Sequence, residues 1–339
     1  MTISTASDEK PLVGITMGDP AGVGPEIVVK ALTNRELYDV CLPVVIGVPA
    51  PLERAASILG AHVDFNLIDV PSAGRFRPGT IDVVPAAHDE NGTVEFGKVQ
   101  AAAGRMAYEC IRLSSELGLE KAIDAVATAP INKESIKAAG IPFIGHTEMY
   151  ASMTGASFAL TMFTVRNLRV FFLTRHLSLA DAIRAVTKER VYETLKQVSF
   201  ALRDLGFSKP RIAVAGLNPH SGEGGLFGYE EIREIAPAIE QARADGIDAC
   251  GPVSADTVFH LGLEGKWDAI LSLYHDQGHI ATKTLDFERT VSVTLGLPFL
   301  RTSVDHGTAF DIAGRGVASA VSMEEAIRVA ARYSHVRRA

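Results

Sequence analysis

Short apolar runs alternate with helix-like segments along most of this chain, and no other feature of the sequence limits its fold as strongly. The runs are brief and often β-branched, as strands buried on both faces of a parallel sheet are; they cover residues 12–16, 43–47, 125–128, 211–215 and 269–273. The segments between them carry apolar residues at spacings of three and four, as amphipathic helices do; they cover residues 25–32, 50–59, 97–117, 188–205, 229–244 and 255–263. This alternation predicts an α/β fold that binds its ligands at the C-terminal ends of the strands.

One pair of apolar runs departs from this pattern. Residues 158–165 and 168–173 are separated only by Arg166-Asn167, which predicts a tight antiparallel hairpin. Such a hairpin inside an α/β chain indicates a second subdomain or a dimerisation element, and 339 residues are enough for about two domains. We expect a first subdomain of residues 10–145 and 305–335 and a second subdomain of residues 146–304.

Composition and charge exclude several classes of partner. The chain has a net charge of −7 and no basic stripe, so we expect no nucleic-acid partner. No apolar stretch approaches the roughly 18 residues that would span a membrane, and the start lacks the apolar run of a signal peptide. The three cysteines share no C-x-x-C spacing, as expected in a reducing compartment. We therefore expect a cytoplasmic protein without a membrane partner.

Four histidine-centred segments lie far apart in the sequence, each beside glycine, proline or other small residues. They cover residues 145–148, 174–177, 218–223 and 274–279. Turn-forming neighbours place histidines on loops rather than inside packed elements. A single histidine is more often structural, but loop histidines from distant parts of a chain can form a metal site or an acid–base centre. The pattern favours one of these two sites.

Two glycine-rich segments are candidates for binding an anion or a dinucleotide. Residues 14–26 follow the first strand and open a helix, where glycines let backbone N–H groups approach a ligand. Their spacing matches neither G-x-G-x-x-G nor Walker A, so a tight turn is an equal alternative. Residues 305–316 combine an imidazole that could stack on a base with a carboxylate that could bind ribose hydroxyls. The alternative there is a capped loop before the last helix, at residues 323–333.

Six motifs together resemble the 4-hydroxythreonine-4-phosphate dehydrogenase family, and they follow one another in the order of that family. They lie at residues 16–22, 128–133, 145–148, 217–220, 274–278 and 301–309. The two glycine-rich segments also resemble the cofactor loops of isopropylmalate and isocitrate dehydrogenases. The resemblance implies a fold of that superfamily, with two α/β subdomains and a cleft between them.

The resemblance also implies site residues. Three histidines would bind a divalent metal at the interface of a homodimer; they are His176, His220 and His275. The substrate-binding positions would be His146, Thr147, Lys283, Ser292 and Arg301. Lys283 and Asp256 are the candidates for proton transfer, and His279 is expected either to be structural or to support a metal ligand. The cofactor-binding positions would be Gly18, Asp19, Gly22, Gly24, His306, Gly307 and Asp311.

The reaction that the resemblance implies is an oxidation of the C3 hydroxyl of a 4-phosphorylated four-carbon acid by NAD, followed by decarboxylation. Imidazole ligands favour Zn²⁺, with Co²⁺, Ni²⁺ or Mg²⁺ as alternatives. Asp311 would repel the 2′-phosphate of NADP, although the nearby Arg315 weakens that preference.

Ser292 departs from the biosynthetic members of the family, which carry asparagine at this substrate-contacting position. Serine has a shorter side chain and no amide donors. The alternative substrates are therefore 4-phospho-D-threonate and 4-phospho-D-erythronate, which have a C2 hydroxyl instead of a C2 amine and give dihydroxyacetone phosphate. A metal-dependent hydrolase or aldolase on a phosphorylated sugar is an alternative of another class, against which the loop at residues 306–314 argues.

Overall fold

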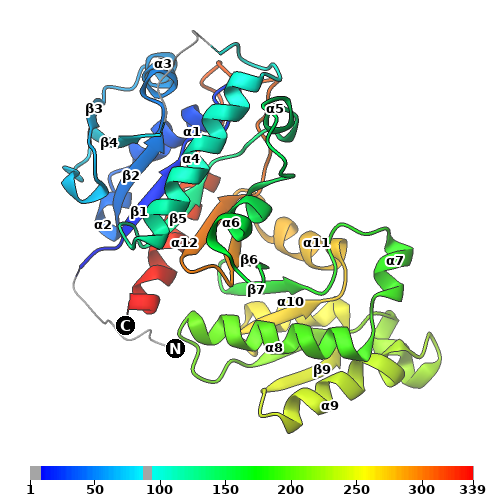
Figure 1. Ribbon diagram of the computed structural model, residues 1–339. Coiled ribbons are helices and arrows are strands. Elements are labelled where there is room, and N and C mark those ends of the chain that lie inside the picture. The colour runs from blue at the N-terminus through cyan, green and yellow to red at the C-terminus, as the bar shows by residue number, and fades with distance from the viewer. Residues whose placement is uncertain (1–8, 87–93, 339) are drawn as a thin grey trace. The chain divides into compact units, whose positions relative to one another are not determined.

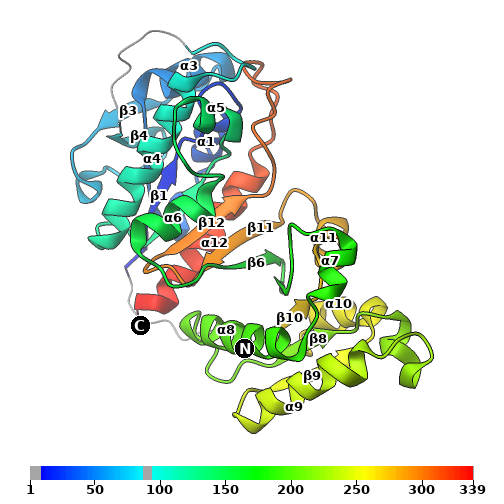
Figure 2. The same ribbon diagram turned by 45° about the vertical axis from the view of Figure 1, so that its right-hand side comes forward.

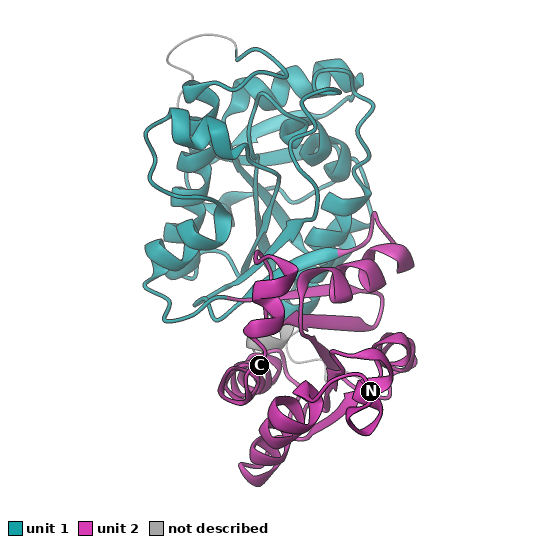
Figure 3. Cartoon of the chain, turned by 90° about the vertical axis from the view of Figure 1, so that its right-hand side faces the viewer, with its two compact units in different colours: residues 1–159, 291–339 teal, residues 160–290 magenta. Residues whose placement is uncertain are grey.

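The computed structural model describes residues 9–86 and 94–338 and divides the chain into two compact units (Figure 3). The first unit comprises Met1–Ala159 and Val291–Ala339, and the second unit comprises Leu160–Thr290. The expected boundaries near Gly145 and Asp305 differ from these because α6 (His146–Thr154) packs on α4 (Ala101–Leu119), and because β11 (Val291–Leu295) pairs with β12 (Leu300–Val304).

The first unit is an α/β layer structure (Figure 1). Its other strands are β1 (Leu12–Thr16), β2 (Leu42–Gly47), β3 (Asp64–Leu67), β4 (Thr80–Pro85) and β5 (Ala125–Thr128). Its other helices are α1 (Gly24–Leu32), α2 (Leu37–Val40), α3 (Pro49–Leu59), η1 (Pro71–Ala73), α5 (Lys133–Ala138) and α12 (Val321–Arg338). The α/β class predicted from the sequence is confirmed.

The strand order in the first unit is β3-β4-β2-β1-β5-β12-β11, and every neighbouring pair is parallel except β11 and β12. Strand β1 is buried at every position because helices cover both faces, which explains its unbroken apolar sequence. Helix α4 packs on β1, β2 and β5, and α12 packs on β5, β12 and β11. Figure 2 shows β11 and β12 side by side in orange.

The strands of the second unit follow the order β6-β7-β10-β8-β9. Its strands are β6 (Leu160–Val165), β7 (Leu168–Phe172), β8 (Ile212–Ala215), β9 (Ala249–Val253) and β10 (Ala269–Ser272). Its helices are α7 (Leu179–Arg184), α8 (Lys188–Asp204), η2 (Pro219–Gly225), η3 (Glu231–Ile235), α9 (Ala236–Ala244), α10 (Ala255–Leu263) and α11 (His275–Leu285). The predicted hairpin is confirmed, since β6 and β7 are antiparallel and Val165 pairs with Leu168.

The helix expected at residues 229–244 is interrupted. Residues Glu231–Ile235 form a turn of π-helix, and the α-helix begins only at Ala236. Pro237 follows at once and has no N–H to donate to the preceding turn, so regular α-helical hydrogen bonding cannot run through this point. This interruption places Glu231 in the site described below.

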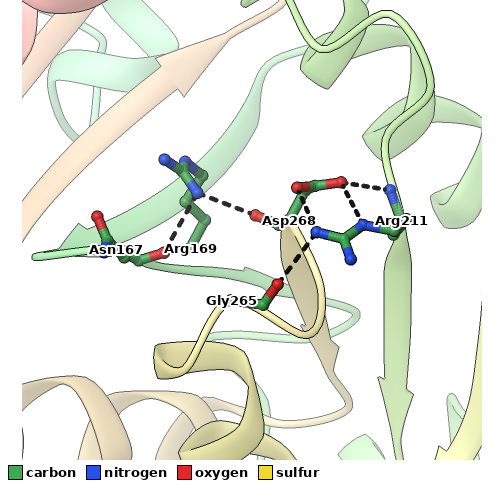
Figure 4. A network of polar contacts seen from close by, with 5 residues as sticks. All are labelled: Asn167, Arg169, Arg211, Gly265 and Asp268. Carbon is green, nitrogen blue, oxygen red and sulfur yellow. Dashed lines mark hydrogen bonds and ion pairs between the residues drawn. The ribbon is translucent and has the colours of Figure 1, made fainter. Parts of the chain in front are cut away.

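A polar network connects residues at the starts of two strands of the second unit, β8 and β10 (Figure 4). Asp268 precedes β10 and accepts hydrogen bonds from the backbone N–H and the guanidinium of Arg211, which precedes β8. Arg169 donates to the carbonyls of Asn167 and Asp268, and Arg211 donates to the carbonyl of Gly265. Burial alone would raise the pKa of Asp268, but the bonds from Arg211 outweigh it and lower that pKa below the ordinary value.

Candidate active site

Hydroxyl side chains form a row across four strands of the first unit. Thr16 pairs with Thr128, Thr128 with Ser303, and Ser303 with Ser292. Directly paired residues of neighbouring strands point to the same face of a sheet, so these four hydroxyls share one face. Thr16 and Thr128 end their strands, so the row lies at the C-terminal strand ends, where the alternation predicted the site.

Arg301 lies beside this row and is only 4% exposed. Its Nη1 donates to Oγ1 of Thr294 and its Nη2 donates to Oγ1 of Thr128, both at 2.9 Å, while its buried Nε has no partner. Burial lowers the pKa of Arg301 to about 10, which still leaves the guanidinium charged at neutral pH. No carboxylate within the described ranges forms an ion pair with it. A buried cation without a counter-charge is costly, so an anionic ligand would stabilise it.

His146 and Thr147 open α6 in the same unit, and both are half-buried. The Nε2 atom of His146 is inaccessible and has no hydrogen-bond partner, and its ring stacks on Tyr150 with the centroids 6.4 Å apart. Burial lowers the pKa of His146 well below its usual value, and the charge of Arg301 lowers it further. His146 is therefore neutral at pH 7 and has one ring nitrogen ready for a ligand.

The first glycine-rich segment is buried throughout, including Gly18, Asp19, Gly22 and Gly24. The N–H of Asp19 donates to the carbonyl of Pro130, and the N–H of Gly22 donates to the carbonyl of Asp19. A Cβ on Gly24 would lie 2.4 Å from the carbonyl oxygen of Met17, so only glycine fits there. Burial raises the pKa of Asp19, whose Oδ2 has no partner.

The second glycine-rich segment presents side chains to solvent. His306 is half-buried, while Gly307 and Asp311 are exposed. The structure joins the two segments, since the N–H of Val23 donates to the carbonyl of Thr308 at 3.0 Å.

Glu26 anchors the second segment and was missed by the sequence analysis. Its buried carboxylate accepts from the N–H groups of Gly314 and Gly316, at 2.6 and 2.7 Å. Only its place in the first turn of α1 distinguishes it in the sequence.

Two of the predicted metal ligands lie close together in the second unit. His176 follows β7, and His275 opens α11 directly after β10, the parallel neighbour of β7. Their ring centroids are 6.3 Å apart. The Nδ1 of His275 lies 2.7 Å from a carboxylate oxygen of Asp276, which is mostly exposed. The C-terminal ends of adjacent strands thus place both imidazoles at one edge of the sheet.

His220 follows β8, the other neighbour of β10. Asp256 lies near enough for His220 to contribute to its electrostatics, although hydrogen bonds from Ser254 and Thr257 are the larger causes that lower the pKa of Asp256. Over residues 9–86 and 94–338, no three His, Cys, Asp or Glu side chains come close enough together to form a complete metal site. The three predicted ligands therefore follow the C-terminal ends of three neighbouring strands, β7, β10 and β8, but their side chains do not form a complete metal site.

The turn that carries His220 is left-handed. Six consecutive residues, 220–225, have positive φ, and three of them are not glycine: His220 (51°), Ser221 (56°) and Glu223 (44°). Left-handed backbone is unfavourable for such residues, so something must hold the turn.

Glu231 supplies that support. It is 2% exposed, and its Oε1 accepts from the N–H groups of Leu217 and Asn218, at 2.8 and 2.7 Å. Its Oε2 accepts from Nδ2 of Asn218 at 2.9 Å. A Cβ on Gly222 would lie 2.8 Å from the same oxygen, so the turn packs directly on the carboxylate.

Gln277 connects the end of β8 to the start of α11. Its Nε2 donates to the carbonyl of Gly216, and its Oε1 accepts from the N–H of Leu273, both at 2.8 Å. The Gln277 amide therefore links the end of β8, which leads to His220, with the end of β10, which leads to His275. Neither Glu231 nor Gln277 was identified from the sequence, although both lie near histidine motifs.

His279 packs one turn after His275, and the two ring centroids are 4.0 Å apart. Phe172 stacks on its ring as well, and its Nδ1 is buried without a partner. Burial lowers the pKa of His279 to about 4, with further lowering by His275, Lys283 and Arg175. The structural role expected for His279 agrees with this packing. Lys283, half-buried in the last turn of α11, has its Nζ 5.2 Å from the ring centroid of Phe287.

Comparison with known proteins assigns the chain to a family. A family model described as pyridoxal phosphate biosynthetic protein PdxA matches residues 39–330. The chain belongs to the PdxA family. The predicted resemblance to 4-hydroxythreonine-4-phosphate dehydrogenases is therefore confirmed, and the PdxA match covers both units.

Relatives of known name support the assignment to the PdxA family over almost the whole chain. Proteins from Symbiobacterium thermophilum and Halalkalibacterium halodurans are 56% and 58% identical over 327 residues, which is 96% of this chain and 98% of each relative. Both carry the provisional name D-threonate 4-phosphate dehydrogenase. The crystal structure of a 4-hydroxythreonine-4-phosphate dehydrogenase from Klebsiella pneumoniae is 42% identical, with a TM-score of 0.90, and the match covers 97% of this chain and 100% of that one.

The PdxA family consists of NAD(P)-dependent dehydrogenases that act on a CH–OH group and use a divalent metal. The donor set of the second unit fits such a metal, because imidazoles are good ligands for first-row divalent ions. Membership of a dehydrogenase family argues against the hydrolase and aldolase alternative. No helix in the described part of the chain is long and apolar enough to cross a bilayer.

Proposed function

We propose that this chain oxidises the C3 hydroxyl of a C4-phosphorylated four-carbon acid with NAD and that the resulting β-keto acid loses CO₂. We propose a sugar acid, 4-phospho-D-threonate or 4-phospho-D-erythronate, as the substrate, with dihydroxyacetone phosphate as the product. The names of the relatives at 56% and 58% identity support this substrate class. The names of the solved structures at 42% and 44% identity support 4-phosphohydroxy-L-threonine, the substrate of vitamin B6 synthesis, as the second candidate.

Buried Arg301 is the observation that carries the proposal. Its guanidinium donates hydrogen bonds to the hydroxyls of two threonines and lies over the ring of Tyr150, with Cζ 5.6 Å from the ring centroid. Its Nε lacks a partner, and the neutral His146 beside it has a free Nε2. An anionic group of the substrate would supply the counter-charge that Arg301 lacks among the described residues, and the planar, paired donors of Arg suit oxyanions. Thr147 would add a hydroxyl donor to the same anionic group.

Ser292 supports the choice of a sugar acid. It stands in the hydroxyl row beside Ser303, and it is half-buried. A serine hydroxyl both donates and accepts a hydrogen bond, so it is complementary to a C2 hydroxyl, which does the same. A C2 ammonium has three donors and no acceptor, and it is better matched by the carbonyl oxygen of an asparagine side chain.

We propose that His176, His220 and His275 hold the metal and that it is Zn²⁺, because all three ligands are imidazoles. When bound, the metal supplies a Lewis acid that stabilises negative charge developing on a substrate oxygen during oxidation and decarboxylation. Asp256 is ionised at neutral pH and can accept a proton. Lys283 is the other candidate for proton transfer, and it can also bind an anionic substrate group.

We propose that the exposed loop around His306 and Gly307 binds NAD. The carboxylate of Asp311 would accept hydrogen bonds from the adenosine ribose and would repel the additional phosphate of NADP. Glu26 would hold this loop in place through Gly314 and Gly316. The buried glycines of the first segment would form the base on which the loop rests.

We propose that the chain acts as a homodimer, with the metal site at the subunit interface. Large apolar side chains next to the metal ligands support this assembly, because they are exposed in the single chain: Leu177 is 47%, Leu226 72%, Phe227 48% and Ile280 64% exposed. Contiguous exposed apolar surface commonly marks an interface.

The test is NADH formation, followed at 340 nm with zinc-loaded enzyme and each of three substrates. We expect kcat/KM to be highest with 4-phospho-D-threonate or 4-phospho-D-erythronate. A preference for 4-phosphohydroxy-L-threonine would place the enzyme in vitamin B6 synthesis instead. Absence of NAD reduction with all three would contradict the proposed function.

A further inference from the structure

Arg175 is a second cation that no carboxylate of the described residues neutralises, and it lies in the other unit. It follows β7, directly before His176, and is half-buried. Its one hydrogen bond within the described residues runs from Nη1 to Oγ1 of Thr161, at 2.5 Å. This leaves Nε and Nη2 without an acceptor among those residues. The residue before it, Thr174, donates to the carbonyl of Leu273 and so ties the segment to the end of β10.

No carboxylate of the described residues forms an ion pair with Arg175. Arg175 acts electrostatically on the ring of His279, which is only 9% exposed and whose Nδ1 has no partner. Asp276 acts on the same ring, but its side chain is 71% exposed and contacts His275. Burying a guanidinium against such neighbours is unfavourable unless a ligand brings negative charge.

We propose that Arg175 binds an oxyanion group of the substrate, and that its charge makes the enzyme prefer a C2 hydroxyl to a C2 ammonium. This inference rests on the proposed function and assigns a further specificity residue to it. The substrate carries two anionic groups, a carboxylate and a phosphate, and Arg175 would bind one of them through its Nε and Nη2 groups. A C2 ammonium would be repelled by Arg175, whereas a neutral hydroxyl would not.

The test uses zinc-loaded enzyme and the variants Arg175→Met and Arg175→Lys. We expect Arg175→Met to raise KM for the phosphorylated sugar acid by about 10- to 100-fold, the usual effect of removing a charge-assisted bond. KM for NAD should stay within about two-fold of the wild-type value, and Arg175→Lys should recover part of the loss because it restores the charge. Arg190→Met is the matched control, since Arg190 is an exposed residue of α8.

Two inhibitors identify the group that Arg175 binds. Inorganic phosphate carries only the phosphate chemistry, and unphosphorylated D-threonate carries only the carboxylate end. Weaker inhibition of Arg175→Met by phosphate alone would assign the phosphate, and weaker inhibition by D-threonate alone would assign the carboxylate. In either case the ratio of kcat/KM for the hydroxy substrate over the amino substrate should fall in the variant.

Several outcomes would overturn the proposal. An unchanged KM, or an unchanged ratio between the two substrates, would show that Arg175 does not contact the substrate. An altered visible spectrum of the Co²⁺-substituted variant, with equal losses for NAD and substrate, would show that Arg175 only positions the loop of His176. If the wild type turns over none of the substrates, the proposed function fails, and calorimetry of both inhibitors with wild type and Arg175→Met still decides whether Arg175 binds oxyanions.

Discussion

Replacing Glu231 by glutamine should displace His220 without unfolding the protein. The carboxylate accepts three hydrogen bonds, two from backbone N–H groups and one from the side chain of Asn218. The amide of the substituted side chain would turn its NH₂ group toward one set of these donors, so at least one bond becomes a donor–donor contact. Each lost bond to a charged acceptor costs about 1.5–3 kcal/mol.

The free energy lost with these hydrogen bonds is comparable with the backbone strain of the turn that the Glu231 carboxylate stabilises. The left-handed turn contains three non-glycine residues, and at about 1–2 kcal/mol each they store about 3–6 kcal/mol. Losing one or two bonds therefore removes enough support for the turn to relax toward ordinary backbone conformations. His220 would then leave its position beside Asp256.

Metal affinity is the quantity that reports this change. We expect Glu231→Gln to bind Co²⁺ about 10- to 100-fold more weakly, as removal of groups that orient metal ligands commonly does. The affinity follows from Co²⁺ absorption and from chelator competition. Glu234→Gln is the matched control, because the carboxylate of Glu234 accepts from the N–H of Lys188 at the start of α8 rather than from the turn. The reasoning is refuted if His220→Ala loses the metal while Glu231→Gln retains wild-type affinity and spectrum.

Three further predictions concern both units. Arg301→Met should raise KM for the substrate by about 10- to 100-fold and leave KM for NAD within about two-fold; equal effects on both would argue against an anion pocket. Ser292→Asn should shift the ratio of kcat/KM toward 4-phosphohydroxy-L-threonine, and an unchanged ratio would mean that Ser292 does not contact C2. Asp268→Asn should lower the free energy of unfolding by about 1.5–3 kcal/mol at pH 7, because it loses charged bonds to Arg211. Since the folded pKa of Asp268 lies below its unfolded value, the wild type should lose this contribution as the pH falls below about 4, and urea unfolding of the variant should lack that part of the pH dependence.

The sequence predicted many of the buried strands, although it missed β4 and β12, which are almost fully buried. Strands such as β1 and β5 are buried on both faces, so their apolar runs were recognisable. Strand β3 was missed because its four residues are all at least partly exposed and include polar ones. Strand β9 is the last in the strand order and contains Gly251-Pro252, a pair that ordinarily indicates a turn. Edge strands bury less apolar surface, so their pattern is weaker.

For the site, the sequence identified groups that could meet a ligand but not the groups that hold them. Glu26 and Glu231 accept hydrogen bonds from backbone N–H groups, which almost every residue has. Nothing in a sequence distinguishes the N–H of Gly314 as the partner of a carboxylate 288 positions earlier. Arg175 was visible beside His176, but its lack of a counter-ion depends on three-dimensional neighbours. Such roles become apparent only when the backbone is in place.

The order of strands in the first unit has a consequence for synthesis of the chain. Strand β12 lies between β5 and β11 in the strand order, yet it is synthesised only after the whole second unit. Until residues 291–304 emerge from the ribosome, β5 therefore keeps an unpaired edge. A ribosome stalled shortly after residue 290 would carry a first unit with an open, aggregation-prone edge.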